Sequence, residues 1–173
     1  MIYKLFMPSQ AVGASLVYFD LWKIAAGGKK MTLLSVVPIV SGAVAVTGVV
    51  AVDLFLTRTT AVGTTGTAAT IEGTSLTAAT FSAYSGDGAI DLSGVSARLT
   101  PGGGATAGAV LSSRSVFSEE TSAGTYIQIA DMVRNSDSLL PPMRVPDGSG
   151  IRVVQGSVAS VGNIGFDIFF DLS

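Results

Sequence analysis

Residues 161–172 read VGNIGFDIFFDL, and this stretch decides the fold class. Large apolar side chains occupy every second position of it: Ile164, Phe166, Ile168, Phe170 and Leu172. A period of two belongs to a β-strand, because successive side chains of a strand point to opposite faces. The stretch therefore predicts a half-buried strand, and we expect residues 150–155 (GIRVVQ) to be its hairpin partner.

The same period recurs in residues 44–57, where valine and leucine share one parity with two exceptions. Residues 31–52 carry no charge and would score as a membrane helix on hydropathy alone. Pro38, Gly42 and Gly48 interrupt that run, and the alternation favours strands over a helix. We predict two buried strands, residues 31–40 and 44–59, that could form a hairpin, with Pro38 at an edge or a bulge.

Branched and aromatic residues between glycine- and serine-rich turns indicate more strands elsewhere. The additional segments are residues 16–24, 95–99, 109–117 and 125–130, and residues 131–138 carry the only helix signal, a single turn. Eight to ten strands with almost no helix predict an all-β, antiparallel sandwich of the jelly-roll type. We expect residues 1–15 to form an N-terminal strand or arm and residues 16–173 a single domain. Within it, residues 59–94 contain a long Thr/Ala/Gly-rich region, expected as a loop or as thin strands.

Composition excludes several function classes. The chain has neither cysteine nor histidine, so disulfides, thiolate or imidazole metal sites and His-dependent catalytic triads are impossible. Its ten basic residues are scattered over a chain of net charge −2, which gives no footprint for nucleic acid. Charged residues make up only 13%, about half the usual share, so we expect other chains to cover part of the surface.

The motifs that could carry chemistry are weak. Residues 101–108 (PGGGATAG) match a dinucleotide fingerprint at Gly102, Gly104 and Ala107, but a strand-like run follows where a helix is needed. Residues 26–30 (AGGKK) lack the spacing of a phosphate loop. We therefore predict no cofactor.

Acidic residues suggest two further possibilities. Glu119-Glu120 is the only adjacent acidic pair, but neighbours on a strand point apart and nothing selects a third carboxylate. Asp87 and Asp91 lie close enough to share a cation, although calcium needs six to eight oxygen ligands. Ordinary turn chemistry explains these aspartates as well, so we predict no enzyme and no metal site.

Aromatic residues on the wrong parity are the best interface candidates. Phe55 and Phe169 stand where their strands otherwise carry small or charged residues, so they face away from the core unless both faces are covered. The apolar N-terminus adds further candidates should it be an arm: Ile2, Tyr3, Leu5 and Phe6.

The chain resembles virion structural proteins of tailed bacteriophages. The resemblance rests on the Thr/Ala/Gly-rich middle (TTAVGTTGTAAT), the charge-poor branched strands, the absence of Cys and His, and the final segment (PDGSGIRVVQGSVASVGNIGFDIFFDL). It implies a capsid decoration (cement) protein on the virion surface. Such a protein would form a homo-oligomer, a trimer by the family pattern, and would contact the major capsid protein without nucleic acid, membrane or catalysis.

The alternative is a tail or fibre module that binds a receptor or glycan. Sugar sites combine aromatic platforms with polar groups. Trp22 and Tyr18 share one parity and could form such a platform, and Tyr84 and Tyr126 lie near turns.

Overall fold

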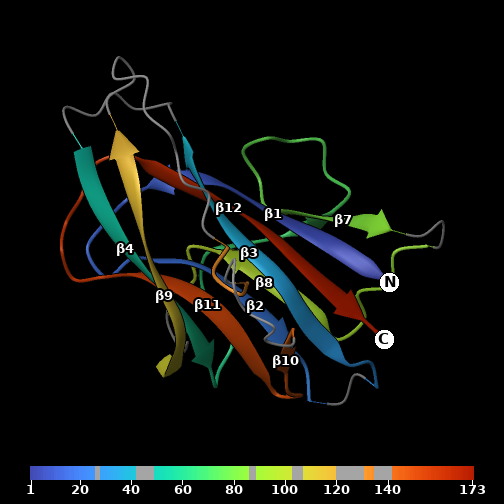
Figure 1. The fold of residues 1–173 in the computed structure, drawn as a ribbon. Helices are drawn as coiled ribbons and strands as arrows, with labels where there is room; N and C mark the ends of the chain where they lie inside the picture. Colours follow the sequence, from blue (N-terminus) through green and yellow to red (C-terminus); the bar gives the residue numbers. More distant parts are fainter. Residues whose placement is uncertain (26–27, 42–48, 86–88, 103–106, 120–130, 135–141) are drawn as a thin grey trace.

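The computed structural model is an all-β sandwich (Figure 1). It describes residues 1–25, 28–41, 49–85, 89–102, 107–119, 131–134 and 142–173. Twelve strands and no helix occur in these segments. Residues 125–130 and 135–138, for which a strand and part of a helical turn were expected, lie outside the described residues.

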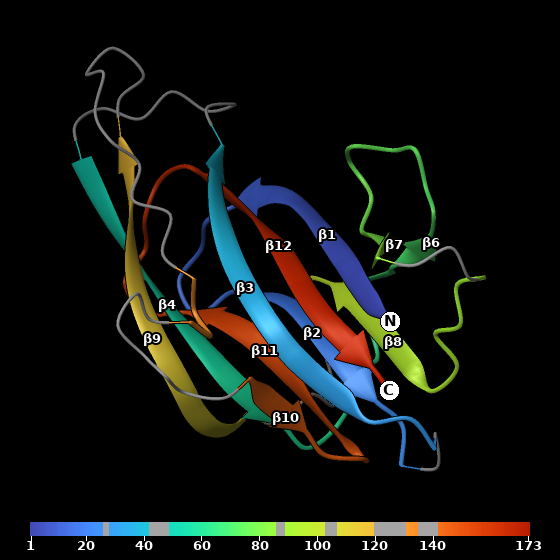
Figure 2. The ribbon, with the colours of Figure 1, turned by 45° about the vertical axis from the view of Figure 1, so that its right-hand side comes forward.

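Two six-stranded sheets pack face to face (Figures 1 and 2). Sheet A has, in spatial order, β10 (Met143–Val145), β3 (Met31–Ser41), β12 (Asn163–Leu172), β1 (Ile2–Ala11), β7 (Thr80–Ser85) and β6 (Thr70–Ile71). Sheet B has β5 (Thr67–Ala68), β8 (Val95–Leu99), β2 (Val17–Lys23), β11 (Ser149–Gln155), β4 (Val49–Thr59) and β9 (Ala107–Glu119). All pairings are antiparallel except β6 with β7.

Eight of these strands follow the jelly-roll scheme. Taken along the chain they are β1, β2, β3, β4, β9, β10, β11 and β12, and the first pairs with the eighth, the second with the seventh, the third with the sixth and the fourth with the fifth. This nested pairing, split over two sheets, is how a jelly roll folds. The predicted antiparallel, jelly-roll-like sandwich is confirmed, although it has twelve strands rather than the eight to ten expected.

The remaining four strands form an insertion between β4 and β9. Strand β7 extends sheet A beside β1, and β8 extends sheet B beside β2, so both sheets widen on the same side (Figure 2). Residues 59–94 supply the two-residue strands β5 and β6, both exposed, and the six-residue strand β7. The part before β7 is therefore a surface connection with thin strands, because its small side chains bury little apolar area.

Strand β12 supplies much of the core. Its five alternating large residues are all buried, and Phe166 packs edge-on against Tyr18 and Phe19 of sheet B with ring centroids 5.2 and 5.3 Å apart. Such aromatic contacts add about 0.5–1.5 kcal/mol each beyond the burial itself. The parity read from residues 161–172 thus matches the face that is buried.

Both expected hairpins are wrong. Strand β3 lies in sheet A and β4 in sheet B, and likewise β11 lies in sheet B and β12 in sheet A. Periodicity shows which face of a strand is buried but not which strand lies beside it. In a jelly roll these connections cross from one sheet to the other, so consecutive strands do not pair.

The expected arm is part of the sandwich. Strand β1 lies between β12 and β7 and pairs with both, so residues 2–11 form a central strand and belong to the same domain as the rest. Its alternation of buried Tyr3, Leu5 and Met7 with half-buried neighbours explains this, since a strand with one apolar face must cover it. Pro38 lies at an edge as predicted, because β10 pairs only with residues 31–33 of β3.

A buried glutamine forms hydrogen bonds to two loops at one end of the sandwich. The buried Gln155 accepts hydrogen bonds through Oε1 from the Tyr18 hydroxyl and the Gly13 N–H, both at 2.8 Å, and donates through Nε2 to the Val158 carbonyl. Burial also raises the pKa of the Tyr18 phenol, which stays a neutral donor. Gln155 therefore ties two loops to the core.

Candidate interaction surface

The outer face of sheet A carries apolar side chains from four adjacent strands, and we call it the A face. Register places Phe169 of β12 between Ser35 of β3 and Lys4 of β1, and Asp167 between Val37 and Phe6. The A face is defined by Val37, Ile39, Ile2, Lys4, Phe6, Asp167, Phe169, Asp171 and Tyr84. These residues are half-buried or exposed, whereas their neighbours on the opposite parity form the core.

Phe169 is the centre of the A face. Its ring meets Tyr84 of β7 edge-on at 4.9 Å between centroids, and the Lys4 ammonium lies 5.8 Å from its centroid. Lys4 also forms an ion pair with Asp167 at 2.8 Å. Tyr84 itself remains 64% exposed. An aromatic pair held in place by a cation and left open on one side resembles the anchor of a protein–protein contact.

The charges of the A face are internally paired. Besides Lys4 with Asp167, the N-terminal ammonium lies 2.9 Å from Asp171. Asp167 keeps a second oxygen, Oδ1, that is buried and has no hydrogen-bond partner. Paired charges between apolar side chains suit a surface that becomes covered, because no unpaired ammonium must then be desolvated.

The interface candidates fall into three groups. Ile2, Phe6 and Phe169 lie on the A face and stay interface candidates. Tyr3 and Leu5 are wrong as interface residues, because both are buried between the sheets. Phe55 faces outward on sheet B, opposite Val154 and Ser113, so it belongs to a different surface.

Sequence reasoning missed how Tyr84 contributes to the A face. The sequence presents Tyr84 only as a possible sugar platform near a turn, whereas in the structure its ring lies beside Phe169. The contact joins β7 to β12 across β1, so no local pattern contains it. The alternation from Phe81 to Tyr84 could have indicated an outward ring, but not its neighbour.

The other aromatic candidates do not gather on one surface. Tyr18 is buried and cannot serve as a platform, whereas Trp22 faces outward on sheet B and is half-buried. Tyr126 lies outside the described residues. A platform of Trp22 and Tyr18 is thus wrong.

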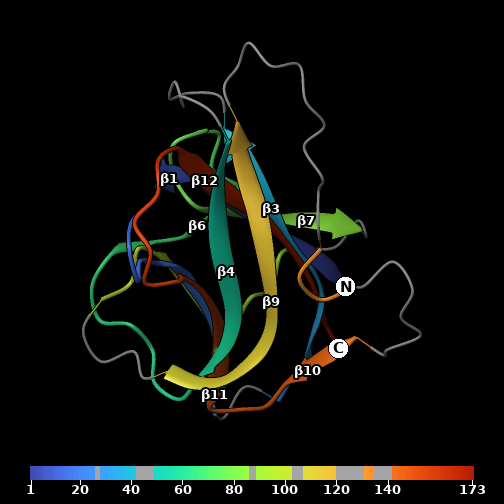
Figure 3. The same ribbon diagram turned by 60° about the vertical axis from the view of Figure 1, so that its left-hand side comes forward.

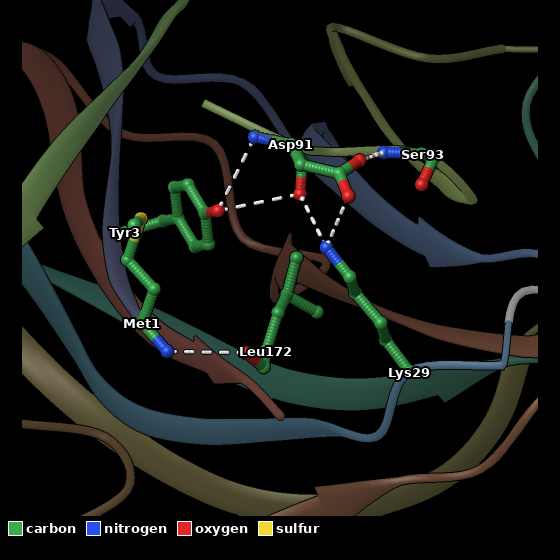
Figure 4. Close-up of polar contacts among 6 residues, drawn as sticks. All are labelled: Met1, Tyr3, Lys29, Asp91, Ser93 and Leu172. Carbon is green, nitrogen blue, oxygen red and sulfur yellow. Dashed lines mark hydrogen bonds and ion pairs between the residues drawn. The ribbon is translucent and has the colours of Figure 1, made fainter. Parts of the chain in front are cut away.

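Asp91 is bound by protein groups (Figure 4). Its Oδ2 lies 2.5 Å from the Lys29 ammonium, its Oδ1 accepts the Ser93 N–H, and the Tyr3 hydroxyl donates to its carbonyl at 3.3 Å. Lys29 and then Ser93 hold the pKa of this carboxyl well below its usual range. The described residues contain no group of three or more acidic side chains that could hold a metal. Asp87 lies outside the described residues.

The glycine-rich stretch and the Glu119-Glu120 pair give no nucleotide or catalytic site among the described residues. Strand β9 begins at Ala107, within the glycine-rich residues 101–108, where a nucleotide site would need a helix. Gly104, Glu120 and the side chain of Glu119 are outside the described residues. No helix in the described part of the chain is long and apolar enough to cross a membrane.

The outer face of sheet B buries an acidic group. Asp20 is fully buried, lies between Arg98 and Arg152 in register, and accepts the Gly63 N–H at 2.7 Å. Its Oδ1 has no hydrogen-bond partner. Desolvation raises the pKa of Asp20, although the Gly63 and Arg98 N–H groups and both guanidinium groups oppose the shift. Desolvation likewise lowers the pKa of Arg152.

We expect the Asp20→Asn variant to gain stability relative to the wild type as pH rises. A raised pKa means that the folded state binds more protons than the unfolded state above pH 3.8, so the contribution of Asp20 to stability falls as pH rises through that window. Asparagine keeps an oxygen for the Gly63 N–H and removes the charge. Urea unfolding of both proteins between about pH 4 and pH 7 measures the difference, and a difference independent of pH would contradict the assignment.

Comparison of the chain with protein-family models, curated proteins and solved structures found no match. The class of the protein is therefore defined by its own fold and surface: a jelly-roll sandwich with an apolar, aromatic-centred face on one sheet.

Proposed function

We propose that this protein is a non-enzymatic structural subunit of a virion, a capsid decoration protein that acts through protein–protein contacts. The observation that carries the proposal is the A face, where apolar side chains of four strands surround the Phe169–Tyr84 pair. Apolar side chains with internally paired charges between them suit a surface that binds another protein, because no unpaired charge must be desolvated.

Three features support a structural role. Jelly rolls recur in viral capsid proteins, although they also occur in lectins and cupins, so the fold alone does not select a function. The chain lacks His and Cys, and its charged share is low. Two acidic groups of the described residues are engaged by protein groups: Asp91 pairs with Lys29, and Asp20 is buried and accepts the Gly63 N–H.

The A face is proposed to hold copies of the chain together on the capsid surface, as a trimer if the resemblance to decoration proteins holds. We expect the Tyr84→Lys variant to self-associate at least about tenfold more weakly than the wild type, because an ammonium would have to be desolvated beside Phe169. Tyr84 is 64% exposed, so the fold should tolerate the change.

The matched control is the Val110→Lys variant. Val110 is 60% exposed, about as much as Tyr84, but it lies on sheet B, where it pairs with Thr57, and not on the A face. Sedimentation velocity over a range of protein concentrations compares the three proteins. Equal association constants for the wild type and the Tyr84 variant would refute the proposed surface, as would a larger loss in the control.

A further inference from the structure

A polar cavity lies at the end of the sandwich where β3 begins. Residues 31–33 of β3 pair with β10 on one side and with the last residues of β12 on the other (Figure 3). Residues 28–30, which lead into β3, and residues 144–147, at the end of β10 and in the turn that follows it, enclose a cavity of about 440 Å³. We call this cavity the basic pocket, and its lining residues are Gly28, Lys29, Lys30, Arg144, Val145, Pro146 and Asp147.

The backbone around the basic pocket is held by hydrogen bonds to neighbouring segments. The Lys30 N–H donates to the Ser173 carbonyl at 2.6 Å, and the Ser173 N–H donates to the Lys30 carbonyl at 3.1 Å. In the turn between β10 and β11, the Gly148 N–H donates to the Lys23 carbonyl at 3.0 Å. Gly148 has a φ of +66°, a left-handed conformation that glycine adopts without strain. The side chains of the pocket therefore extend from fixed backbone.

Two cations of the basic pocket have no ion-pair partner among the described residues. Lys30 and Arg144 are both exposed, and neither occurs in an ion pair of the described chain. Arg144 pairs with Thr32 in register, and Lys30 lies two residues before Thr32, so the two cations are diagonal neighbours on one side of the sheet. Diagonal positions on adjacent strands are about 7–8 Å apart, so two long side chains can reach one small ligand.

The carboxylate side chains around the basic pocket are already paired. Asp147 lines the pocket, but it forms an ion pair at 3.5 Å with the fully buried Lys23. Asp91 pairs with Lys29 at 2.5 Å, as Figure 4 shows. Each of these pairs joins one cation to one carboxylate, so the positive charges of Lys30 and Arg144 are left without a partner in the pocket.

We propose that the basic pocket binds a phosphate group, either free or carried by a small ester, between Arg144 and Lys30. A phosphate monoester carries about −1.5 to −2 charges at pH 7, which matches two cations, whereas a carboxylate matches only one. The Arg144 guanidinium can donate two parallel N–H groups to phosphate oxygens, and the Lys30 ammonium adds a compact point charge. The volume of about 440 Å³ lies in the range of small-molecule sites and leaves room for the organic part of an ester.

The proposed site differs from a phosphate loop and from the A face. Lys29 and Lys30 belong to residues 26–30 (AGGKK), and strand β3 follows them where a phosphate loop would continue into a helix. The phosphate is therefore held by side chains and not by a helix N-terminus. The site goes beyond the proposed function and does not need the A face, because Tyr84 lies on β7, four strands away from β10 in sheet A. Either proposal can fail without the other.

Isothermal titration calorimetry at low salt tests the site, with inorganic phosphate and glucose 6-phosphate as probes. We expect the Lys30→Gln and Arg144→Gln variants each to bind both probes at least about tenfold more weakly than the wild type, because each variant loses a charge-assisted contact. The Arg144→Lys variant keeps the charge but not the planar fork, so it should also bind more weakly. Tighter binding of glucose 6-phosphate than of inorganic phosphate identifies an ester as the ligand, and the reverse order identifies the free ion.

The Arg134→Gln variant is the matched control, because Arg134 is an exposed cation outside the basic pocket. It should bind both probes as the wild type does. Glucuronate, a sugar carboxylate with one charge, should bind at least about tenfold more weakly than glucose 6-phosphate. The proposal is overturned if neither phosphate binds at millimolar concentration, if the control loses as much affinity as the pocket variants, or if glucuronate binds as tightly as glucose 6-phosphate. Thermal unfolding of each variant checks that the fold is intact.

Discussion

Replacing Phe166 by alanine is expected to lower the free energy of unfolding by about 3–5 kcal/mol, the range for removing a fully buried phenylalanine from a core. The ring is fully buried in sheet A and packs edge-on against both Tyr18 and Phe19 of sheet B. Its removal would open a cavity between the two sheets where three aromatic rings meet. Urea unfolding at a fixed, low protein concentration measures the loss.

Phe169 supplies the matched control, because it is the same residue type three positions further along the same strand. It faces outward, half-buried, against Tyr84. The Phe169→Ala variant should therefore lose only about 1 kcal/mol, the value of one aromatic contact. Equal losses at the two positions would mean that both faces of β12 are core, and the A face would not exist as a surface.

Replacing Gly150 by alanine is expected to cost roughly 3 kcal/mol, at the upper end of the range for overpacking. A Cβ at this position would lie 2.5 Å from the Leu21 carbonyl oxygen and 2.9 Å from a methyl group of Thr59. Gly150 pairs with Trp22 on one side and Thr59 on the other, so β11 cannot move away from one neighbour without approaching the next. Thermal unfolding would show the loss as a lower midpoint.

Gly156, just beyond the other end of β11, is the control for this substitution. A Cβ there would make only ordinary contacts, the nearest at 3.4 Å from the Phe55 ring. The Gly156→Ala variant should unfold within about 1 kcal/mol of the wild type, as a substitution without overpacking does. If Gly150→Ala were equally mild, strand β11 would not lie between β2 and β4.

The sequence predicted the faces of strands better than their neighbours. The parity of residues 161–172 identified both the buried set and the outward Phe169, because burial acts on each side chain through the period of its own strand. Strand order depends on contacts between distant segments, which no local pattern contains. For this reason the hairpins of residues 31–59 and 150–172 were wrong although nearly every strand in them was right.

The candidate surface was predictable only in part. Phe169, Phe6 and Ile2 could be proposed from parity and composition, but Tyr84 joins them only through the insertion that adds β7 beside β1. Tyr3 and Leu5 were misplaced because a free arm and a central strand can share one apolar sequence. The burial of Asp20 could not be foreseen either, since its cover comes from Gly63, 43 residues away.

The central proposal, which rests on the low charged share and the A face, is that this jelly roll works as an assembled subunit. The most direct measurement is the mass of the wild-type protein in solution by light scattering at micromolar concentration. The proposed function predicts a mass that is a multiple of the 17.5 kDa chain, three times that value for a trimer. A protein that stays at 17.5 kDa at every concentration tested would contradict it.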